Sequence, residues 1–528
     1  MQGKKHQAQK LFVCFQLTDR VPADNFYRRL GDELDLSFLY GATKGYYGSE
    51  GQKSIDPVVF FKLILVGYLE NLNSDRRIIT HASMRLDILY FIGYDIDEAL
   101  PWHSTLSRSR QLYGEEVFLS LFKKVLSLCV CKGMVSGKRQ AVDSAFVKAN
   151  ASMDSLVEKE VLHDAGVYAA ELAANDEDTK TVSFSKKRQI ATRQAWQSDN
   201  YRNPGSDGSK DRVDEDGRPI RPKLLSNDTH YSATDPDARI SVKPGKARQL
   251  NYSAQTSVDT AHHVITNIMA DYSDKRDSQS LGAIVKQTKQ HLEENGLQLE
   301  ELLADTGYSS GKALQVLEDN NITGYIPNHG RYKAEREGFT YYSQGDYYQC
   351  HQGVKLPFKY ATKAYKHTST TNVYSSSAKD CARCPFKSYC IGAKYSFKQI
   401  SVTTDKALYD KMHERMQTAK ARIMRKKRSS TVEPVLGTLL NFMGMRRVWT
   451  RGIKAANKFM IGAAIAYNLK KWLNYTAATV KTQAKAMQKP LAKIIDAIIA
   501  YTASGTNLKY YIILSTKSTF VSTSNLTL

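Results

Sequence analysis

Cysteine is scarce in this chain, with 7 in 528 residues at irregular spacing, so a framework of paired disulfides is not implied. No apolar run approaches the length of a membrane span, and the first 10 residues are polar and basic, unlike an export leader. We therefore expect a cytoplasmic protein without a membrane partner. Hydrophobic residues make up 42% of the chain, which is enough for a large core and more than one domain.

Acidic residues are also in the minority, because 53 Asp and Glu face 75 Lys and Arg, for a net charge of +22. Residues 391–475 alone hold 18 Lys and Arg against 4 Asp and Glu. Such an excess predicts a polyanionic partner, since each neutralised phosphate releases counterions. A ribosomal or membrane-surface protein would share this charge, but the large core argues against the first. The predicted phosphate contacts are Arg425, Lys426, Lys427, Arg428, Arg446, Arg447 and Arg451.

Residues 1–138 carry a helical pattern throughout. Asp56-Pro57 is an N-cap followed by proline at the first helical position, and residues 58–69 are apolar enough for a core helix. Ser74 is expected to cap one continuous helix that runs through Leu89. A helical bundle of this kind binds DNA through helix-turn-helix geometry or serves only in dimerisation and packing, and the sequence leaves both interpretations open.

Three acidic residues stand where a carboxylate needs a partner. Asp143 lies inside an apolar segment that alternates like a strand, and its burial without a cation, hydrogen bonds or a sheet-end position would be costly. Asp305 follows the strand-like Leu302-Leu303, which places it at the carboxyl end of a strand, where open α/β sheets bind ligands. Glu433 is the only acidic residue in a long basic stretch. Taken singly, Asp305 is typical of a helix cap and Glu433 of a salt-bridge hub.

The segments around these acids follow the order strand, insertion, strand, strand, helix, strand, helix, which predicts an α/β sheet flanked by helices. Residues 153–174 and 404–428 are each expected to form one helix, with Ser309 as the cap of the helix after Asp305. The expected divisions are a helical DNA-binding or dimerisation domain at 1–138, the first part of the core at 139–330 with a polar insertion at about 150–250, a tyrosine- and cysteine-rich insertion at 331–400, a basic helical end of the core at 401–475, and a tail at 476–528.

Four of the cysteines gather in the second insertion. Cys381 and Cys384 have the pair spacing of a zinc knuckle, and Cys350 and Cys390 complete a set of four thiols. A structural zinc ion and free thiols are the two interpretations, and a catalytic role for these cysteines is not indicated.

Asp143, Asp305 and Glu433 together suit a reaction that none of them supports alone. Two hard cations held about 4 Å apart by oxygen ligands activate a water or a 3′-hydroxyl and stabilise the leaving oxygen of a phosphodiester. Mg²⁺ prefers such oxygen ligands and keeps several waters for the substrate. Clustered acids repel one another, so without metal we expect this site to be disordered or partly protonated.

The chain resembles the DDE transposases of bacterial insertion sequences, which carry an RNase H-like catalytic core. The resemblance runs from about residue 24 to 473, and the order of its motifs is more specific than any one of them. The motifs are Ala141-Val142-Asp143-Ser144, Ala304-Asp305-Thr306-Gly307-Tyr308, Val432-Glu433-Pro434-Val435-Leu436-Gly437, Pro101-Trp102-His103-Ser104-Thr105-Leu106-Ser107-Arg108, Thr234-Asp235-Pro236-Asp237-Ala238-Arg239, Cys381-Ala382-Arg383-Cys384-Pro385, and Met445-Arg446-Arg447 through Arg451-Gly452.

This resemblance implies that Asp143, Asp305 and Glu433 are catalytic and bind two Mg²⁺ or Mn²⁺ ions. It implies an enzyme that nicks double-stranded DNA at transposon ends and joins the freed 3′-hydroxyl to target DNA. Because two ends must be cut and joined, it also implies a homodimer or larger assembly on DNA, in a nucleoid-associated protein of the bacterial cytoplasm.

The sequence departs from the family around its glutamate. Related transposases often have a Tyr seven residues before it, an Arg four before and a Lys seven after, where this chain has Lys426, Ser429 and Leu440. Arg428 is the candidate replacement for the arginine, and Arg446 or Arg447 for the lysine. Two alternative functions remain: a catalytically inactive, transposase-derived DNA-binding protein, and a metal-dependent DNA nuclease that cleaves without joining.

Overall fold

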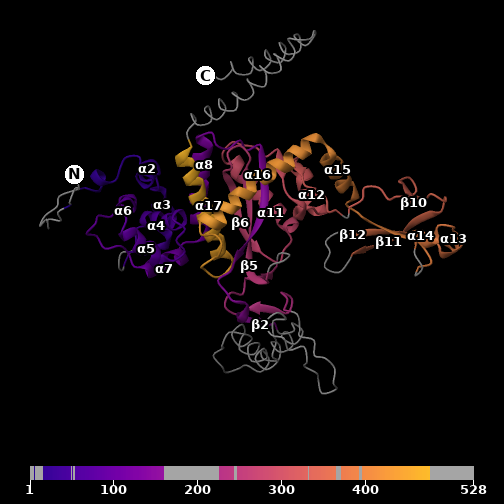
Figure 1. The fold of residues 1–528 in the computed structure, drawn as a ribbon, viewed down its shortest axis with the longest axis horizontal. Coiled ribbons are helices and arrows are strands. Elements are labelled where there is room, and N and C mark those ends of the chain that lie inside the picture. The colour runs from indigo at the N-terminus through magenta and orange to yellow at the C-terminus, as the bar shows by residue number, and fades with distance from the viewer. Residues whose placement is uncertain are drawn as a thin grey trace, which may run out of the picture. The chain divides into compact units, whose positions relative to one another are not determined.

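The computed structural model describes residues 16–48, 54–159, 225–242, 247–330, 332–363, 370–391 and 395–475, together with Lys5 and Glu50. The chain divides into two compact units, Met1–Trp472 and Leu473–Leu528 (Figure 1). The predicted tail at 476–528 and most of the predicted polar insertion, residues 160–224, lie outside the described residues. The finer division into domains stays a prediction.

The N-terminal region is helical, as the sequence predicts. Asp56 accepts hydrogen bonds from the backbone N–H groups of Val58 (2.6 Å) and Val59 (3.2 Å), which caps α4 as expected. Helix α4 is apolar on all sides and almost wholly buried, so it forms the centre of this region. The elements are α1 (Leu17–Arg20), α2 (Phe26–Glu33), α3 (Phe38–Thr43), η1 (Lys44–Tyr46), α4 (Pro57–Leu69), α5 (Asp75–Ser83), α6 (Leu86–Ile92), α7 (His103–Leu112) and α8 (Glu115–Cys131).

The prediction of one continuous helix from Ser74 to Leu89 is wrong. The chain forms two helices, α5 and α6, because Met84 and Arg85 leave helical geometry between them. The guanidinium of Arg85 forms an ion pair with the carboxylate of Asp87, two residues later on α6, at an N–O distance of 2.7 Å. This local ion pair stabilises the break between the two helices. Gly93, with φ of 82°, ends α6 in the left-handed conformation that favours glycine.

The central sheet has the RNase H-like order. In the described residues, five strands lie side by side in the order β6, β5, β1, β7, β8. A short sixth strand, β4, pairs with the first residues of β5. The pairs β6·β5 and β5·β1 are antiparallel, whereas β1·β7 and β7·β8 are parallel, which makes the sheet mixed as predicted. The strands are β1 (Arg139–Lys148), β4 (Arg239–Ser241), β5 (Gln249–Asp259), β6 (Ile265–Tyr272), β7 (Glu301–Leu303) and β8 (Thr323–Tyr325).

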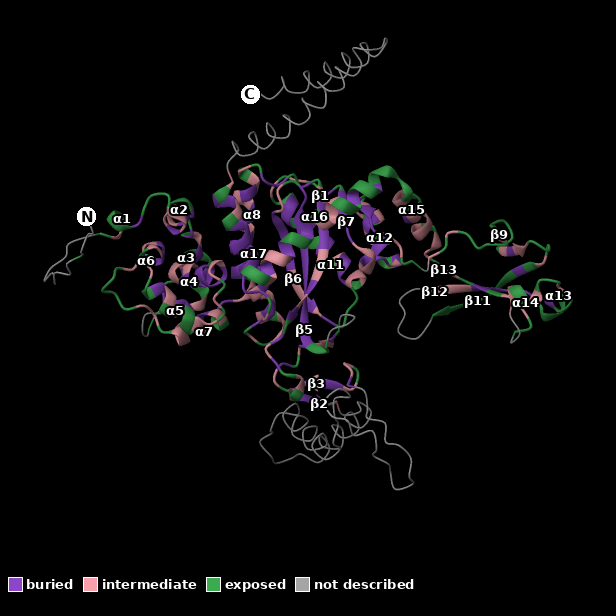
Figure 2. Ribbon diagram, in the orientation of Figure 1, coloured by how far each residue is buried: buried purple, intermediate pink, exposed green. Residues whose placement is uncertain are grey.

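Helices cover this sheet on its faces and at one edge, and β5 is buried along nearly its whole length (Figure 2). Asn468 on α17 accepts a hydrogen bond from the backbone N–H of Ile265 (2.9 Å) and donates one to its carbonyl (2.8 Å), so the helix closes the free edge of β6. No helix of the described residues is long and apolar enough to cross a membrane. The helices are α11 (Asp277–Glu293), η3 (Thr306–Tyr308), α12 (Gly311–Asp319), α15 (Lys406–Gln417), α16 (Ala419–Phe442) and α17 (Ile453–Asn474).

A second antiparallel sheet is built from the tyrosine- and cysteine-rich segment. The described strands follow the order β13-β12-β11-β10-β9, around a small apolar cluster of Tyr348, Leu356, Tyr374 and Ile400. Asp346, with φ of 46°, lies in the turn between β9 and β10. The elements are β9 (Phe339–Tyr342), β10 (Tyr347–Cys350), β11 (Lys355–Lys363), β12 (Thr370–Ser375), α13 (Ala378–Ala382), α14 (Lys387–Cys390) and β13 (Gln399–Thr403).

Three further predictions need correction. The helix predicted from residue 153 begins instead as η2 (Met153–Ser155) and β2 (Leu156–Glu158), which pairs with β3 (His230–Ser232), and residues 160–174 lie outside the described residues. The helix predicted at 404–428 is two helices, because Thr418 has extended geometry and caps α16 by accepting from the N–H of Ala421 (3.2 Å). Ser310, and not Ser309, caps α12.

Candidate active site

Asp143 lies in the middle of β1, the central strand. It is directly opposite Thr256 of β5, while β7 pairs with β1 only as far as Ala141. Strand β1 therefore continues past the end of its parallel neighbour, and Asp143 lies just beyond that point. Its side chain is 16% exposed, so a carboxylate that the sequence places in an apolar strand is indeed largely buried.

Asp305 follows β7 after a single intervening residue. Its carboxylate accepts a hydrogen bond from the backbone N–H of Gly307 (2.9 Å), so it caps the short helix η3. A Cβ atom at Gly307 would lie 3.1 Å from oxygens of both Asp305 and Asp277, so these two carboxylates flank the same glycine. The helix-cap interpretation of Asp305 is thus correct, but the cap faces a second acid.

Glu433 lies within α16 and reaches the other acids through an arginine. Arg428, five residues earlier on the same helix, donates through Nη2 to Glu433 (2.8 Å) and through Nη1 to Asp143 (2.8 Å). The Arg428 side chain is 17% exposed, whereas that of Glu433 is 55% exposed. A single guanidinium therefore links a buried carboxylate on the central strand to an exposed one on the helix that packs against it.

Burial controls the electrostatics of this site. It raises the pKa of Asp143 above its ordinary value, and the negative charge of Asp305 adds to the effect, while the Arg428 guanidinium and the N–H of Ser144 oppose it. The pKa of Tyr308 is raised by its burial and by the charges of Asp277, Asp143 and Asp305. The charges of all three acids therefore act on one buried phenol.

The sequence did not single out Asp277 or its contacts. Tyr308 donates to the side-chain oxygen of Gln255 (2.5 Å), and the amide nitrogen of Gln255 donates to Asp277 (3.0 Å). Asp277 is the first residue of α11, so an acid at the start of this helix was the local signal that could have found it.

The carboxylates fit a hard divalent cation in their chemistry. They offer only oxygen atoms, and Arg428 already places one positive charge between Asp143 and Glu433. Within the described part of the chain, no three Asp, Glu, His or Cys side chains are arranged to share a metal ion. Since the guanidinium lies between the two carboxylates, a bound ion requires Arg428 to move.

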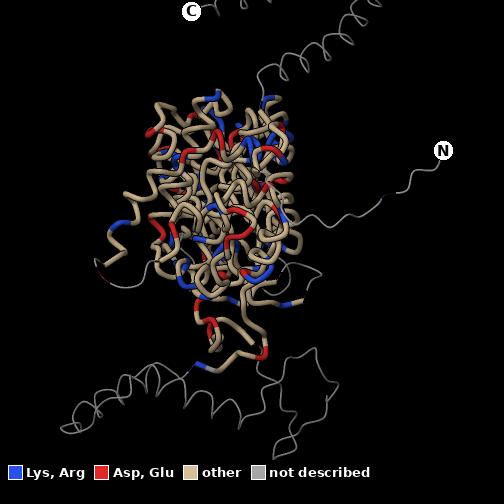
Figure 3. The backbone as a smooth tube through the Cα atoms, turned by 90° about the vertical axis from the view of Figure 1, so that its left-hand side faces the viewer, with Lys and Arg blue, Asp and Glu red and all other residues tan. Residues whose placement is uncertain are grey.

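The predicted phosphate contacts occupy two segments. Arg425 and Lys426 are exposed on α16, and Lys427 is half-buried beside them. Arg447 donates to Asn150 (3.1 Å), and its guanidinium lies 4.9 Å from the centre of the Trp449 ring. Basic and acidic residues are interspersed along the backbone in the view of Figure 3.

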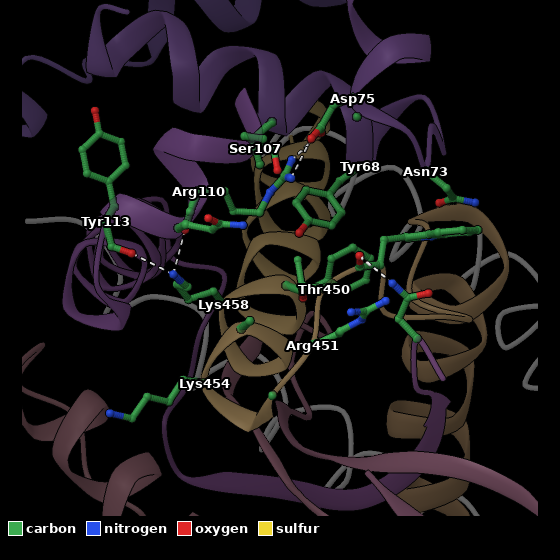
Figure 4. Close-up of a pocket in the computed structure, with 18 of the residues that line it drawn as sticks. Tyr68, Asn73, Asp75, Ser107, Arg110, Tyr113, Thr450, Arg451, Lys454 and Lys458 are labelled. Carbon is green, nitrogen blue, oxygen red and sulfur yellow. Dashed lines mark hydrogen bonds and ion pairs between the residues drawn. The ribbon is translucent and has the colours of Figure 1, made fainter. Parts of the chain in front are cut away.

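Arg451 lines a cavity of about 1,090 Å³ between α4, α7 and the start of α17 (Figure 4). Arg110 on its wall is paired with Asp75 at 2.6 Å, and Lys458 donates to two backbone carbonyls, so both of these cations hold the fold together. Arg451 and Lys454 are exposed at the cavity.

The motif at residues 234–239 has a structural explanation. Asp235 accepts a hydrogen bond from the N–H of Gly452 (3.0 Å), and Asp237 accepts one from the N–H of Ile453 (2.9 Å). The two acids thus hold the amino-terminal end of α17, where the negative charge also favours the helix dipole. This motif positions α17 and brings no carboxylate to Asp143.

The four predicted zinc ligands meet at one place. Cys350, Cys381, Cys384 and Cys390, with His351, line a small cavity of about 30 Å³ between the second sheet and its two short helices. All four cysteines are free thiols, and Cys381 is the most buried. Since no three of them are arranged to share an ion, zinc binding stays a prediction.

Two family models match the sequence, a transposase domain (DUF772) at residues 15–112 and a transposase DDE domain at residues 349–473. No curated protein matches it. Among solved structures, a piggyBac transposase synaptic complex with hairpin DNA aligns over 92% of this chain and 81% of that chain, at 10% identity and a TM-score of 0.30. So low a score carries no argument about this chain.

Proposed function

We propose that this chain is a DDE-type transposase that cleaves DNA at transposon ends and transfers the freed strand into target DNA, and the matches to two transposase domain models support this proposal. The observation that carries the proposal is the pairing of Asp143 and Glu433 through one guanidinium, on a strand and a helix far apart in the sequence. The charge of Asp305 acts on Asp143 at the same place.

We assign the metal-binding role to Asp143, Asp305 and Glu433. Two Mg²⁺ or Mn²⁺ ions, when bound, supply the activation of the attacking water or 3′-hydroxyl and the stabilisation of the leaving oxygen. Asp143 is held on a strand that is paired on both sides, and Asp305 is fixed by its hydrogen bond to Gly307, so both carboxylates have defined positions. Glu433 is exposed and bound only through Arg428, which makes it the adjustable member of the set.

The basic side chains of α16 and of the segment after it are the proposed contacts to the DNA backbone. Arg425 and Lys426 are exposed on the helix that carries Glu433, so phosphates bound there lie near the carboxylates. Arg446 and Arg451 are exposed further along the chain, near the end of β1 and at the large cavity. Because two ends must react together, we propose a homodimer or larger assembly on DNA.

Cleavage of a supercoiled plasmid that carries both transposon ends tests this function. With Mg²⁺, the wild type is expected to give nicked, linear and strand-transfer products, and Asp305→Asn is expected to bind the ends without cutting them. Asp319→Asn is the matched control, because Asp319 is exposed at the end of α12 and accepts a hydrogen bond from Gln315 on its own helix (2.6 Å).

Equal cutting by wild type and Asp305→Asn would contradict the assignment and leave Asp305 as a helix cap. Binding without any product in either protein would indicate an inactive, transposase-derived DNA-binding protein. Cut products without joined ones would indicate a nuclease that does not perform strand transfer.

A further inference from the structure

The second sheet has a composition unlike the rest of the chain. Residues 339–403 hold 13 of the chain's Phe, Trp and Tyr residues, which is one residue in five, against 10% for the whole protein. The same segment has 9 Lys and Arg but only 2 Asp and Glu. Aromatic and basic residues are therefore concentrated together in a module that contributes none of the three carboxylates.

The two faces of this sheet differ. Tyr348 and Tyr374 point to the apolar cluster on one face, so their neighbours Tyr347 and Val373 point to the other. A bulge between Phe358 and Tyr360 changes the register of β11, and Tyr360 pairs with Val373. Without this bulge, Phe358 and Tyr360, two positions apart on β11, would lie on the same face of the sheet. Because of the bulge, Tyr360 lies on the same face as Tyr347.

Directly paired residues lie on one face, so Tyr342, which is opposite Tyr347, belongs there as well. Lys355 is two residues before Pro357, the partner of Tyr347, and it also points to this side. We call these four residues, Tyr342, Tyr347, Lys355 and Tyr360, the tyrosine face. Helices α13 and α14 lie on the opposite face, where their cysteines share a cavity with Phe339, Cys350 and Leu356.

The rings of the tyrosine face are ordered but uncovered. Tyr342 and Tyr347 are stacked, with centroids 5.2 Å apart and planes 14° from parallel. The ammonium of Lys355 lies 5.0 Å from the centre of the Tyr347 ring. Tyr342 remains 43% exposed and Tyr360 46% exposed. A flat aromatic surface with a cation beside it is thus available on the outside of a sheet.

The positive charge and the exposed rings of the tyrosine face together indicate which class of ligand it would bind. An apolar protein partner would gain little from a lysine beside the rings, whereas a polyanion gains from the positive charge of Lys355. Planar groups that stack on tyrosine and carry phosphates are nucleotides, and their faces are accessible only where the strand is unpaired. We propose that the tyrosine face binds a single strand of DNA by stacking its bases. This inference rests on the proposed function, since it adds a contact for unpaired DNA to an enzyme that acts on DNA ends.

Fluorescence anisotropy of a labelled oligo(dT) strand with the full-length protein in EDTA tests the proposal. Tyr342→Ala and Tyr360→Ala are each expected to weaken binding of oligo(dT) about tenfold, because each removes one stacking ring. Tyr360→Phe keeps the ring and is expected to bind as the wild type does. Tyr389→Ala is the matched control, since Tyr389 is 93% exposed on α14, away from this face.

In the same experiment, binding of a duplex that carries a transposon end is measured in parallel with oligo(dT) binding. Duplex binding is expected to be unchanged in all four variants. Unchanged oligo(dT) binding in both alanine variants would overturn the inference, while retained duplex binding would leave the proposed function intact. A wild type that binds neither probe would overturn both. Loss of self-association in Tyr342→Ala, with oligo(dT) binding intact, would make this face a contact between copies of the chain and overturn the proposal.

Discussion

The guanidinium of Arg428 is expected to be the main support of the buried carboxylate when no metal is bound. The Asp143 and Arg428 side chains are 16% and 17% exposed, and their atoms are 2.8 Å apart. Removing one partner of a buried, hydrogen-bonded ion pair costs about 3 kcal/mol, because the other charge is left without compensation. The contact with Glu433, which is 55% exposed, is worth only about 0.5 kcal/mol.

Arg428→Met is therefore expected to lower the free energy of unfolding by about 3 kcal/mol in EDTA at neutral pH, nearly all of it through Asp143. Urea unfolding of the single and double variants measures this cycle. In the background of Asp143→Asn the same substitution is expected to cost about 1 kcal/mol or less, and in the background of Glu433→Gln nearly the full amount. The cost is expected to shrink at acidic pH, where the Asp143 carboxyl takes up a proton.

Arg425→Met is the matched control, because Arg425 is exposed one turn earlier on the same helix. Mg²⁺ is expected to stabilise Arg428→Met more than it stabilises the wild type, since the ion no longer displaces a guanidinium. Equal losses in Arg428→Met and Arg425→Met, or no rescue by Asp143→Asn, would refute the reasoning.

Two further predictions concern protonation and zinc. Because burial raises the pKa of Asp143, the folded chain binds this proton more tightly than the unfolded chain, so the stability it contributes is present at low pH and is lost as pH rises through the raised pKa. In EDTA the unfolding temperature of the wild type is thus expected to fall as pH rises through this range, and Asp143→Asn is expected to remove that part of the pH dependence in a melting series; an unchanged pH dependence in Asp143→Asn would contradict this. If the thiols beside the second sheet bind zinc, elemental analysis is expected to find about one zinc per chain, lost in Cys381→Ser and Cys384→Ser but not in Cys131→Ser. A wild type free of zinc after growth with added metal would mean that the thiols are free.

Local signals in the sequence predicted much of the fold. The cap at Asp56 and the helix over residues 58–69 appear at nearly the predicted bounds, and the alternating segment around Asp143 forms a strand. These elements depend on side chains within a few residues of one another, and such patterns are visible without a structure. Prediction was weaker wherever an element depends on distant contacts.

Helix α16 illustrates the second case. It continues past Arg428 and through Pro434, although proline inside a helix removes a hydrogen bond. Both Pro434 and Ser430, whose carbonyl loses that bond, are exposed, so water can serve the carbonyl instead. The buried residues Val432, Val435 and Leu436 hold this part of the helix in place, and their burial depends on packing that the local sequence does not reveal.

In the candidate active site too, features marked by the local sequence could be predicted, and features that depend on distant contacts could not. Asp143, Asp305 and Glu433 could be selected from the sequence because each is out of place in its own surroundings. Arg428 was predicted to contact phosphate, and its pairing with two of the acids depends on how α16 crosses β1, which no local pattern encodes. The second sheet was visible as a tyrosine-rich segment, but the bulge that turns Tyr360 outward was not.

The order of the site along the chain has a consequence for protein synthesis. Asp143 and Asp305 are translated before the second sheet. Asp143 lies on β1 and Asp305 follows the adjoining strand β7, whereas Glu433 is translated only after the whole second sheet. On the proposed assignment, a chain whose translation stops within that sheet has two of the three acids, lacks α16 with its basic side chains, and lacks the helix that closes the edge of β6. Incomplete copies of this protein would thus lack one of the three proposed metal ligands and much of the proposed contact surface for DNA.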